Sequence, residues 1–128
     1  MISERLHKLF LLSIPLFIVH GIEEYLTGFY NVDDILFGHL SPDISQSAFA
    51  IFQVLWWIFL ITIYKLSKSK YGFNLMIFVG LIYIFELHHL IHALFIEKAY
   101  YPGVITAIGF PIFTLFFWKE LIKNRRKT

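Results

Sequence analysis

The sequence predicts an all-α protein that forms a four-helix transmembrane bundle, and its composition is the first reason. Of its 128 residues, 58% are hydrophobic and only 16% are charged, whereas an average soluble domain has about 25% charged residues. A small soluble domain needs a polar covering, because surface dominates at low mass. The composition therefore disfavours a soluble or disordered chain and favours an integral membrane protein.

Four apolar segments give the second reason, because each approaches the length of a membrane-spanning helix. A helix of about 20 mainly apolar residues crosses a bilayer, and it satisfies its own backbone hydrogen bonds in lipid. We expect one four-span domain over residues 1–128. The predicted spans cover residues 9–29, 46–64, 72–96 and 103–119.

The positions of the basic residues predict the orientation. Ten of the eleven Lys and Arg residues precede the first span, follow the last span or lie between the second and third, with Lys98 as the exception. Cytoplasmic loops carry an excess of basic residues, so the N- and C-termini should both be cytoplasmic. We expect a multi-pass protein of the bacterial plasma (inner) membrane. Its basic tail at residues 123–127 should meet anionic lipid head groups.

Ionisable side chains gather at two places within the predicted spans. Such residues are costly in a membrane and usually functional. At a rise of 1.5 Å per residue, both clusters sit roughly 15–30 Å from the cytoplasmic end of their helix, in the outer half of the bilayer. Two clusters at the same depth are expected if both helices contribute to a single site. The clusters consist of His20, Glu23 and Glu24 in the first span, and Glu86, His88, His89 and His92 in the third.

The residue types in these clusters favour a metal site, because imidazole and carboxylate together suit zinc, iron or manganese. The spacing His20-x-x-Glu23-Glu24 has the outline of a zinc peptidase helix. In that arrangement His20 and Glu24 are ligands and Glu23 is the catalytic general base. In the third span, Glu86-x-x-His89 has the spacing that di-iron bundles use.

The third span leaves the choice of its ligands open. At about 100° per residue, Glu86, His89 and His92 share one arc, with His88 at its edge. His88 and His92, at i and i+4, form the alternative pair. We expect His92 to be a metal ligand beside the two ligands of the first span. Glu86 or His89 would be a further ligand, and His88 a residue of the surrounding pocket.

A turn before the fourth span carries another motif, Tyr-Tyr-Pro-Gly at residues 100–103. The His-x-x-Glu-Glu pattern, a later histidine with His92 as its counterpart, and this turn together resemble the HXXEE family of small integral membrane proteins. The resemblance covers nearly the whole chain. It implies a membrane location and a shared site, and it implies no established activity. Tyr100 or Tyr101 would then line the pocket, or the turn is only a rigid entry into the fourth span.

Three functions suit such a site in the outer half of the bilayer. We expect first a metal-dependent hydrolase, with zinc favoured as its divalent ion. A di-iron-type carboxylate oxidoreductase ranks lower, because such sites use four carboxylates. The third alternative is a non-enzymatic protein that binds or transports a metal ion, protons or a small ligand. The expected partners are membrane lipids, a lipid-like or small amphipathic substrate and, for transport, a second copy in a homodimer. No nucleic acid is expected.

Overall fold

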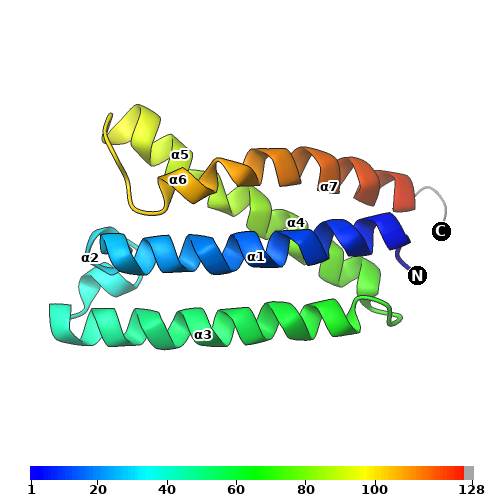
Figure 1. The fold of residues 1–128 in the computed structure, drawn as a ribbon, viewed down its shortest axis with the longest axis horizontal. Helices are drawn as coiled ribbons and strands as arrows, with labels where there is room; N and C mark the ends of the chain where they lie inside the picture. Colours follow the sequence, from blue (N-terminus) through cyan, green and yellow to red (C-terminus); the bar gives the residue numbers. More distant parts are fainter. Residues whose placement is uncertain (126–128) are drawn as a thin grey trace.

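The computed structural model describes residues 1–125, and every regular element within them is helical (Figure 1). Arg126 and Lys127, which belong to the predicted basic tail, lie outside the described residues. The elements are α1 (Glu4–Thr27), α2 (Phe29–Val32), η1 (Phe37–His39), α3 (Pro42–Leu66), α4 (Gly72–Glu86), α5 (His88–Ile91), the π-helical turn η2 (His92–Ile96), α6 (Val104–Ala107) and α7 (Gly109–Arg125).

Four helical stretches of the described chain are long and apolar enough to cross a membrane. The first two are α1 and α3. The third runs through α4, α5 and η2 over Gly72–Ile96, and the fourth runs through α6 and α7 over Val104–Arg125. The predicted all-α class with four apolar spans is therefore confirmed, and these helices suggest a membrane protein.

Local signals set the ends of the first two long helices. The Ser3 side chain accepts a hydrogen bond from the Leu6 backbone N–H at 3.2 Å, so α1 begins before the apolar stretch. At the other end Gly28 has a φ of 78° and its N–H donates to the Glu24 carbonyl. Pro42 occupies the first turn of α3, where no N–H is needed. Both helices therefore begin earlier than the predicted spans.

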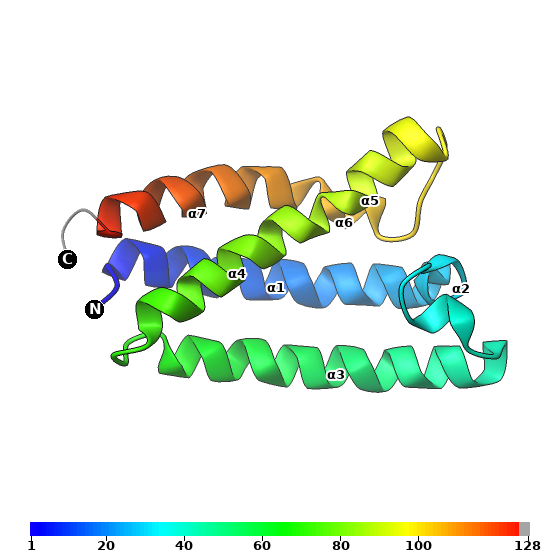
Figure 2. The same ribbon diagram turned by 180° about the vertical axis from the view of Figure 1, so that it is seen from behind.

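The core is built around α1, which lies between α3 and α7 while α4 crosses it (Figures 1 and 2). Phe17 of α1 packs 5.7 Å from the ring of Tyr83 on α4 and 4.9 Å from the ring of Phe110 on α7. Large apolar side chains such as Leu12 and Leu115 point outward and are exposed. An apolar exterior around a closed helical backbone suits a lipid environment.

The start of α1, the end of α7 at Arg125 and the connection between α3 and α4 lie at one end of the bundle, here called the terminal end (Figure 1). Lys68 Nζ lies 3.0 Å from Glu4 Oε1, and Arg5 Nε lies 3.6 Å from Glu120 Oε2. The described basic residues early in α1, around the end of α3 and late in α7 therefore share this end. Its assignment to the cytoplasm stays a prediction.

The third span is interrupted, and the interruption shapes the site. The Leu87 N–H bonds to the Ile84 carbonyl at 3.1 Å between α4 and α5. The span then ends in the π-helical turn η2, which begins at His92. A π turn winds more loosely than an α-helix and is frequent at functional sites. Angles counted on one regular helix therefore do not hold along the whole third-span cluster.

Candidate metal centre

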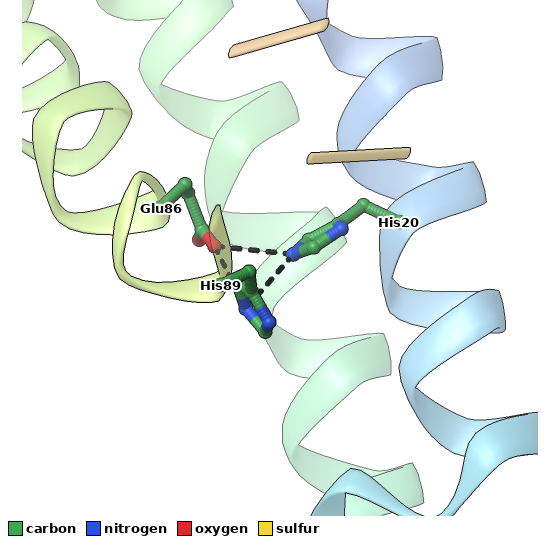
Figure 3. A group of neighbouring side chains, drawn as sticks. All are labelled: His20, Glu86 and His89. Carbon is green, nitrogen blue, oxygen red and sulfur yellow. Dashed lines mark hydrogen bonds and ion pairs between the residues drawn. The ribbon is translucent and has the colours of Figure 1, made fainter. Parts of the chain in front are cut away.

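Three side chains from three helices meet (Figure 3), and their positions in the helices place them in the half of the bundle away from the terminal end. His20 comes from α1, Glu86 from the last residue of α4 and His89 from α5. His20 Nε2 lies 3.1 Å from Glu86 Oε2 and 3.2 Å from His89 Nε2. His89 Nε2 lies 3.5 Å from the same Glu86 oxygen. Both histidines are buried, and the group could hold a metal ion.

Glu24 joins this group from the next turn of α1. Its Oε1 lies 3.1 Å from His89 Nε2 and 3.6 Å from His20 Nε2. Its second oxygen, Oε2, accepts a hydrogen bond from Gln53 Nε2 of α3 at 2.9 Å. One carboxylate oxygen is thus satisfied by the bundle, while the other faces the imidazoles. We call His20, Glu24, Glu86 and His89 the His/Glu quartet.

The outer hydrogen bonds of the two histidines determine which ring nitrogen carries the proton. His89 Nδ1 lies 2.7 Å from the Pro102 carbonyl, which can only accept, so this nitrogen is the donor. His20 Nδ1 lies 2.8 Å from Thr106 Oγ1. The Thr106 hydroxyl donates its single proton to Glu23 Oε2, so it accepts from His20. Each neutral ring therefore presents a bare Nε2 to the quartet.

The centre of the quartet brings four acceptor atoms together. Two Nε2 lone pairs and two carboxylate oxygens converge, and the hydrogen-bond donors around them lie on their outer sides. With both carboxylates ionised the group carries a charge of −2, which is costly to bury without compensation. The arrangement therefore needs a cation or added protons at its centre.

The spacing of the ligand atoms matches a small metal ion. Five distances between quartet atoms fall between 3.1 and 3.6 Å. Around a tetrahedral zinc ion with bonds of about 2.0–2.1 Å, ligand atoms lie about 3.3 Å apart. Two His and two carboxylate ligands are also a donor set that zinc accepts. The ligand atoms of His20, Glu86 and His89 lie close enough together to hold one ion, and Glu24 Oε1 lies 3.1 Å and 3.6 Å from the two imidazoles of this group.

The Tyr-Tyr-Pro-Gly turn closes one side of the quartet. Gly103 has a φ of 85°, a conformation that favours glycine. A Cβ at this position would lie 2.9 Å from His20 Cε1 and 2.9 Å from His89 Cε1. The turn also supplies the Pro102 carbonyl that accepts from His89. Residues 102 and 103 therefore orient both imidazoles, beyond the rigid helix entry that the sequence alone predicts.

Glu23 lies outside the quartet and is held at the start of α6. Its carboxylate accepts hydrogen bonds from the backbone N–H of Ile105 at 3.1 Å and of Thr106 at 2.8 Å. It also accepts from the hydroxyl of Thr106 and from the hydroxyl of Tyr100, the latter at 2.8 Å. Glu23 thus reaches His20 through Thr106, in the way that outer carboxylates orient metal-binding histidines. Its predicted role as general base stays a prediction.

The remaining histidines of the third span lie beside the quartet. His92 stacks on Tyr101 with ring centroids 4.6 Å apart, and its Nδ1 is buried without a hydrogen-bond partner. His88 Nδ1 donates to the Phe85 carbonyl at 2.9 Å. On an ideal helix His92 lies about 120° around from Glu86, and Tyr101 holds its ring on that side. Neither histidine belongs to the group of described residues that could hold the ion, and their predicted roles stay predictions.

The two tyrosines of the turn differ in their surroundings. Tyr100 is exposed and binds Glu23, and partial burial together with that carboxylate raises the pKa of its phenol. Tyr101 is buried between His92 and Phe29, and burial raises its pKa to about 12. Both phenols therefore stay protonated at neutral pH. Tyr101 forms part of the packing around His89, with ring centroids 5.6 Å apart.

Thr106 is the functional residue that sequence reasoning missed. A threonine within a span commonly bonds its own backbone, so its type carries no signal for a metal site. The partner of His89 is a backbone carbonyl, which any residue could supply. In the sequence, only the motif at residues 100–103 indicates that the segment around Pro102 and Thr106 contributes to the site.

A cavity of about 230 Å³ adjoins the quartet. Its wall includes three quartet residues, with Gln53 and His88 beside them. The rest of the wall is largely aromatic and includes Phe17, Phe49 and Trp56. An apolar cavity with a few converging polar groups is the usual form of a ligand site. The quartet is therefore accessible to an apolar molecule, although its histidines are buried.

Comparison with known proteins identifies a family for most of the chain. The model of one protein family matches residues 11–117, which include the whole quartet and the turn. No curated protein and no solved structure matches the chain. The family is described as a protein of unknown function with an HXXEE motif. The match covers most of the chain, and the protein therefore belongs to the HXXEE family.

Proposed function

We propose that this protein binds one divalent metal ion at the His/Glu quartet, in the outer half of a bacterial plasma membrane, with zinc favoured. The convergence of two bare Nε2 atoms and two carboxylate oxygens carries this proposal. A divalent ion balances the charge of −2 and satisfies all four acceptors at once. The outer hydrogen bonds to Thr106 and Pro102 are the kind that fix metal-binding histidines.

Two added protons are the competing way to balance the charge. Each would sit on an Nε2 atom or on a carboxylate oxygen of Glu24 or Glu86, because both Nδ1 atoms already carry protons. Consider first one proton on each Nε2 atom. Two N–H groups would then face one another across 3.2 Å between His20 and His89. Donors at this separation repel, whereas a cation attracts both lone pairs. The geometry therefore disfavours two protonated imidazoles, and metal analysis separates a bound ion from protons on the carboxylates.

The same contacts rank the alternatives. Four-helix di-iron sites use four carboxylates, and the quartet supplies two, which favours zinc over a di-iron centre. Between His20 and the terminal end, α1 buries Phe17, Ile14 and Phe10. This apolar packing favours an enzyme or a binding protein over a conduit for ions.

We further propose that the metal serves the hydrolysis of an apolar or amphipathic substrate. A bound divalent ion supplies Lewis-acid chemistry and an activated water molecule. The adjoining cavity supports this proposal, because it leads an apolar molecule to Glu24 and Glu86. The residues of the chain hold the ion, orient both imidazoles and surround the substrate with apolar side chains.

Glu23 has two proposed roles that one variant separates. As the general base it would take a proton during hydrolysis; as a positioning residue it orients His20 through Thr106. If Glu23→Gln keeps the metal and loses turnover, the general base is favoured. If the variant loses metal affinity, the positioning role is favoured.

Elemental analysis of the purified full chain tests the metal. We expect about one ion per chain in the wild type and none in His20→Ala, because a ligand is lost. His88→Ala is the matched control, since its imidazole lies next to the quartet but donates to the Phe85 carbonyl; its metal content should be unchanged. Wild-type protein that contains no metal after purification without chelator would contradict the proposal.

Hydrolysis is tested separately with a panel of chromogenic long-chain esters. Turnover should be abolished by a chelator and by His20→Ala, and should survive in Thr114→Val, whose hydroxyl is buried without a hydrogen-bond partner away from the cavity. Turnover that persists in the chelated protein would contradict metal-dependent hydrolysis.

A further inference from the structure

The cavity beside the His/Glu quartet has a single polar region. That region consists of quartet atoms with Gln53 and His88 next to them. One further acid, Asp33, borders the cavity, but its carboxylate accepts hydrogen bonds from backbone N–H groups of residues 35–37. The other lining side chains are apolar. Such a cavity suits a molecule with one polar head and an apolar body.

The rim of the cavity faces the side of the bundle. Phe52 of α3 and Phe85 of α4 line the cavity and are 44% and 56% exposed, whereas Phe17 and Phe49 are 2% and 1% exposed. The two exposed side chains lie within stretches apolar enough to cross a membrane. Figure 2 shows α4 diverging from α3 along the bundle toward α5. Ile35 and Leu36, between α2 and η1, also line the cavity and are exposed, so its rim runs from this loop to the lateral faces of α3 and α4, where hydrocarbon would surround the helices.

The size of the cavity limits what it can enclose. Sites that bury a drug-sized ligand have volumes of about 300–1,000 Å³, and this cavity has about 230 Å³. It can hold a polar head and the first part of one chain. The remainder of a longer chain would pass between Phe52 and Phe85 into the bilayer.

The charge of the quartet determines which polar head group the cavity favours. One divalent ion with two carboxylates and two neutral imidazoles is electrically neutral, so it offers no net attraction to an anionic head. His88 donates from Nδ1 to the Phe85 carbonyl, which leaves its Nε2 as an acceptor beside the cavity. A hydroxyl can present its oxygen to the ion and donate its proton to such an acceptor. A phosphate or carboxylate head would meet the oxygens of Glu24 and Glu86.

We propose that the cavity binds a neutral single-chain lipid, whose hydroxyl or carbonyl head lies at the quartet and which enters from the bilayer between α3 and α4. The position of the head rests on the proposed metal site, whereas the position of the chain rests on the cavity alone. This inference names the substrate class and the route by which it reaches the site.

Tryptophan fluorescence tests the position of the chain, because two neighbouring tryptophans face different places. Trp56 lines the cavity, and Trp57 lines a separate groove between α1 and α3. One variant keeps Trp56 alone (Trp57→Phe, Trp118→Phe), and the matched control keeps Trp57 alone (Trp56→Phe, Trp118→Phe). Each full chain is placed in nanodiscs of unbrominated phosphatidylcholine and titrated with a brominated long-chain alcohol, whose bromine atoms quench nearby indoles.

We expect saturable quenching of Trp56 at low mole fractions of the alcohol, and only gradual, unsaturated quenching of Trp57. Replacing the alcohol by a brominated fatty acid anion should raise the mole fraction needed for half-maximal quenching about tenfold. This factor corresponds to the free energy of about one hydrogen bond to a charged group. His20→Ala in the background with Trp56 alone should weaken alcohol binding by about the same factor. If loss of the Trp118 hydrogen bond to the Gly80 carbonyl prevents folding, both variants keep Trp118.

The outcomes separate this inference from the proposed metal site, provided that the metal content is measured on the same samples. Equal, unsaturated quenching of the two tryptophans overturns the inference, whatever the metal content. Tighter binding of the anion than of the alcohol overturns the neutral head. Saturable quenching of Trp56 in metal-free wild-type protein supports the bound chain and contradicts the metal site.

Discussion

His7 and His20 are both buried histidines of α1, and comparing them shows what separates a structural imidazole from a metal ligand. His7 Nδ1 lies 2.8 Å from Ser67 Oγ, and its ring stacks on Tyr64 at 4.3 Å between centroids. The Ser67 hydroxyl donates to the Tyr64 carbonyl at 2.7 Å, so this chain of hydrogen bonds ends on a neutral acceptor. His20 instead presents its second nitrogen to another imidazole and two carboxylates.

The difference lies in convergence and not in burial. Both side chains are less than a tenth exposed, so burial alone does not distinguish them. At His7 the Nδ1 proton is accepted by Ser67, whose own proton goes to the Tyr64 carbonyl. At the quartet His20, Glu86 and His89 bring their acceptor atoms together in a group that could hold a cation, with Glu24 Oε1 next to both imidazoles. Changes at the two places should therefore have different effects on metal content and on stability.

The largest effect on the quartet should come from Gly103→Ala. A Cβ there meets both imidazoles at 2.9 Å, and the positive φ adds a cost of about 1–2 kcal/mol for a non-glycine residue. We expect the metal content of the purified variant to fall to background. Gly28→Ala is the matched control, because it has a similar φ of 78° but its Cβ meets only an Asn31 side chain. The Gly28→Ala variant should lose stability and keep its metal. Equal metal content in both variants would contradict the role of the close contact between residue 103 and the two imidazoles.

Removal of the metal should have the next largest effect. A ligand present at 1,000 times its dissociation constant stabilises the folded state by roughly 4 kcal/mol. A chelator should therefore lower the thermal unfolding midpoint of the wild type in detergent, and adding zinc back should restore it. His20→Ala should show no such response. A wild-type midpoint that is insensitive to chelator would indicate that protons and not a metal balance the quartet.

Thr106→Val should weaken the metal site without destroying it. The change removes the oxygen that accepts from His20 and that links it to Glu23. Loss of an outer hydrogen-bond partner of a ligand costs about 10–100-fold in metal affinity, which competition with a zinc chelator of known affinity measures. Thr114→Val is the matched control, because the Thr114 hydroxyl is buried without a partner. The same loss in both variants would show that the effect is not specific to His20.

Ser67→Ala should have the smallest effect and should act only at the terminal end. It leaves His7 Nδ1 without its partner, which costs about 1–3 kcal/mol for a buried polar group. The unfolding midpoint should fall while the metal content stays at the wild-type value, in contrast to the changes at the quartet. A change in metal content would mean that the two histidines of α1 are coupled along the helix.

The members of the quartet could be predicted from the sequence as ligand candidates, because ionisable residues within apolar spans are conspicuous. His20, Glu24, Glu86 and His89 were all among the predicted ligands, and the structure brings them together. The choice among the third-span histidines could not be made. It depends on the interruption at Leu87 and on partners distant in the sequence, which have no periodic signal.

The outer contacts of the site are harder to predict from the sequence than the quartet itself. Glu23 stands beside Glu24 in the chain, and composition treats the two alike. In the structure one faces the imidazoles, whereas the other accepts from the first turn of α6. Their directions differ by about 100° on the helix, so each meets a different neighbour. Only the packing of α6 against α1 assigns them different partners.

The sequence by itself determined the class of protein. Hydrophobic segments of span length with few charges form helices in lipid, because a helix satisfies its own backbone hydrogen bonds there and an open strand does not. It also determined that rare ionisable groups share one half of the bundle. The tertiary structure decided which atoms converge. The interrupted third span aligns Glu86 with His89, and Thr106 and Pro102 turn both Nε2 atoms inward. The physical reason is that the direction of a side chain depends on neighbours far along the chain, whereas hydrophobicity belongs to each segment alone.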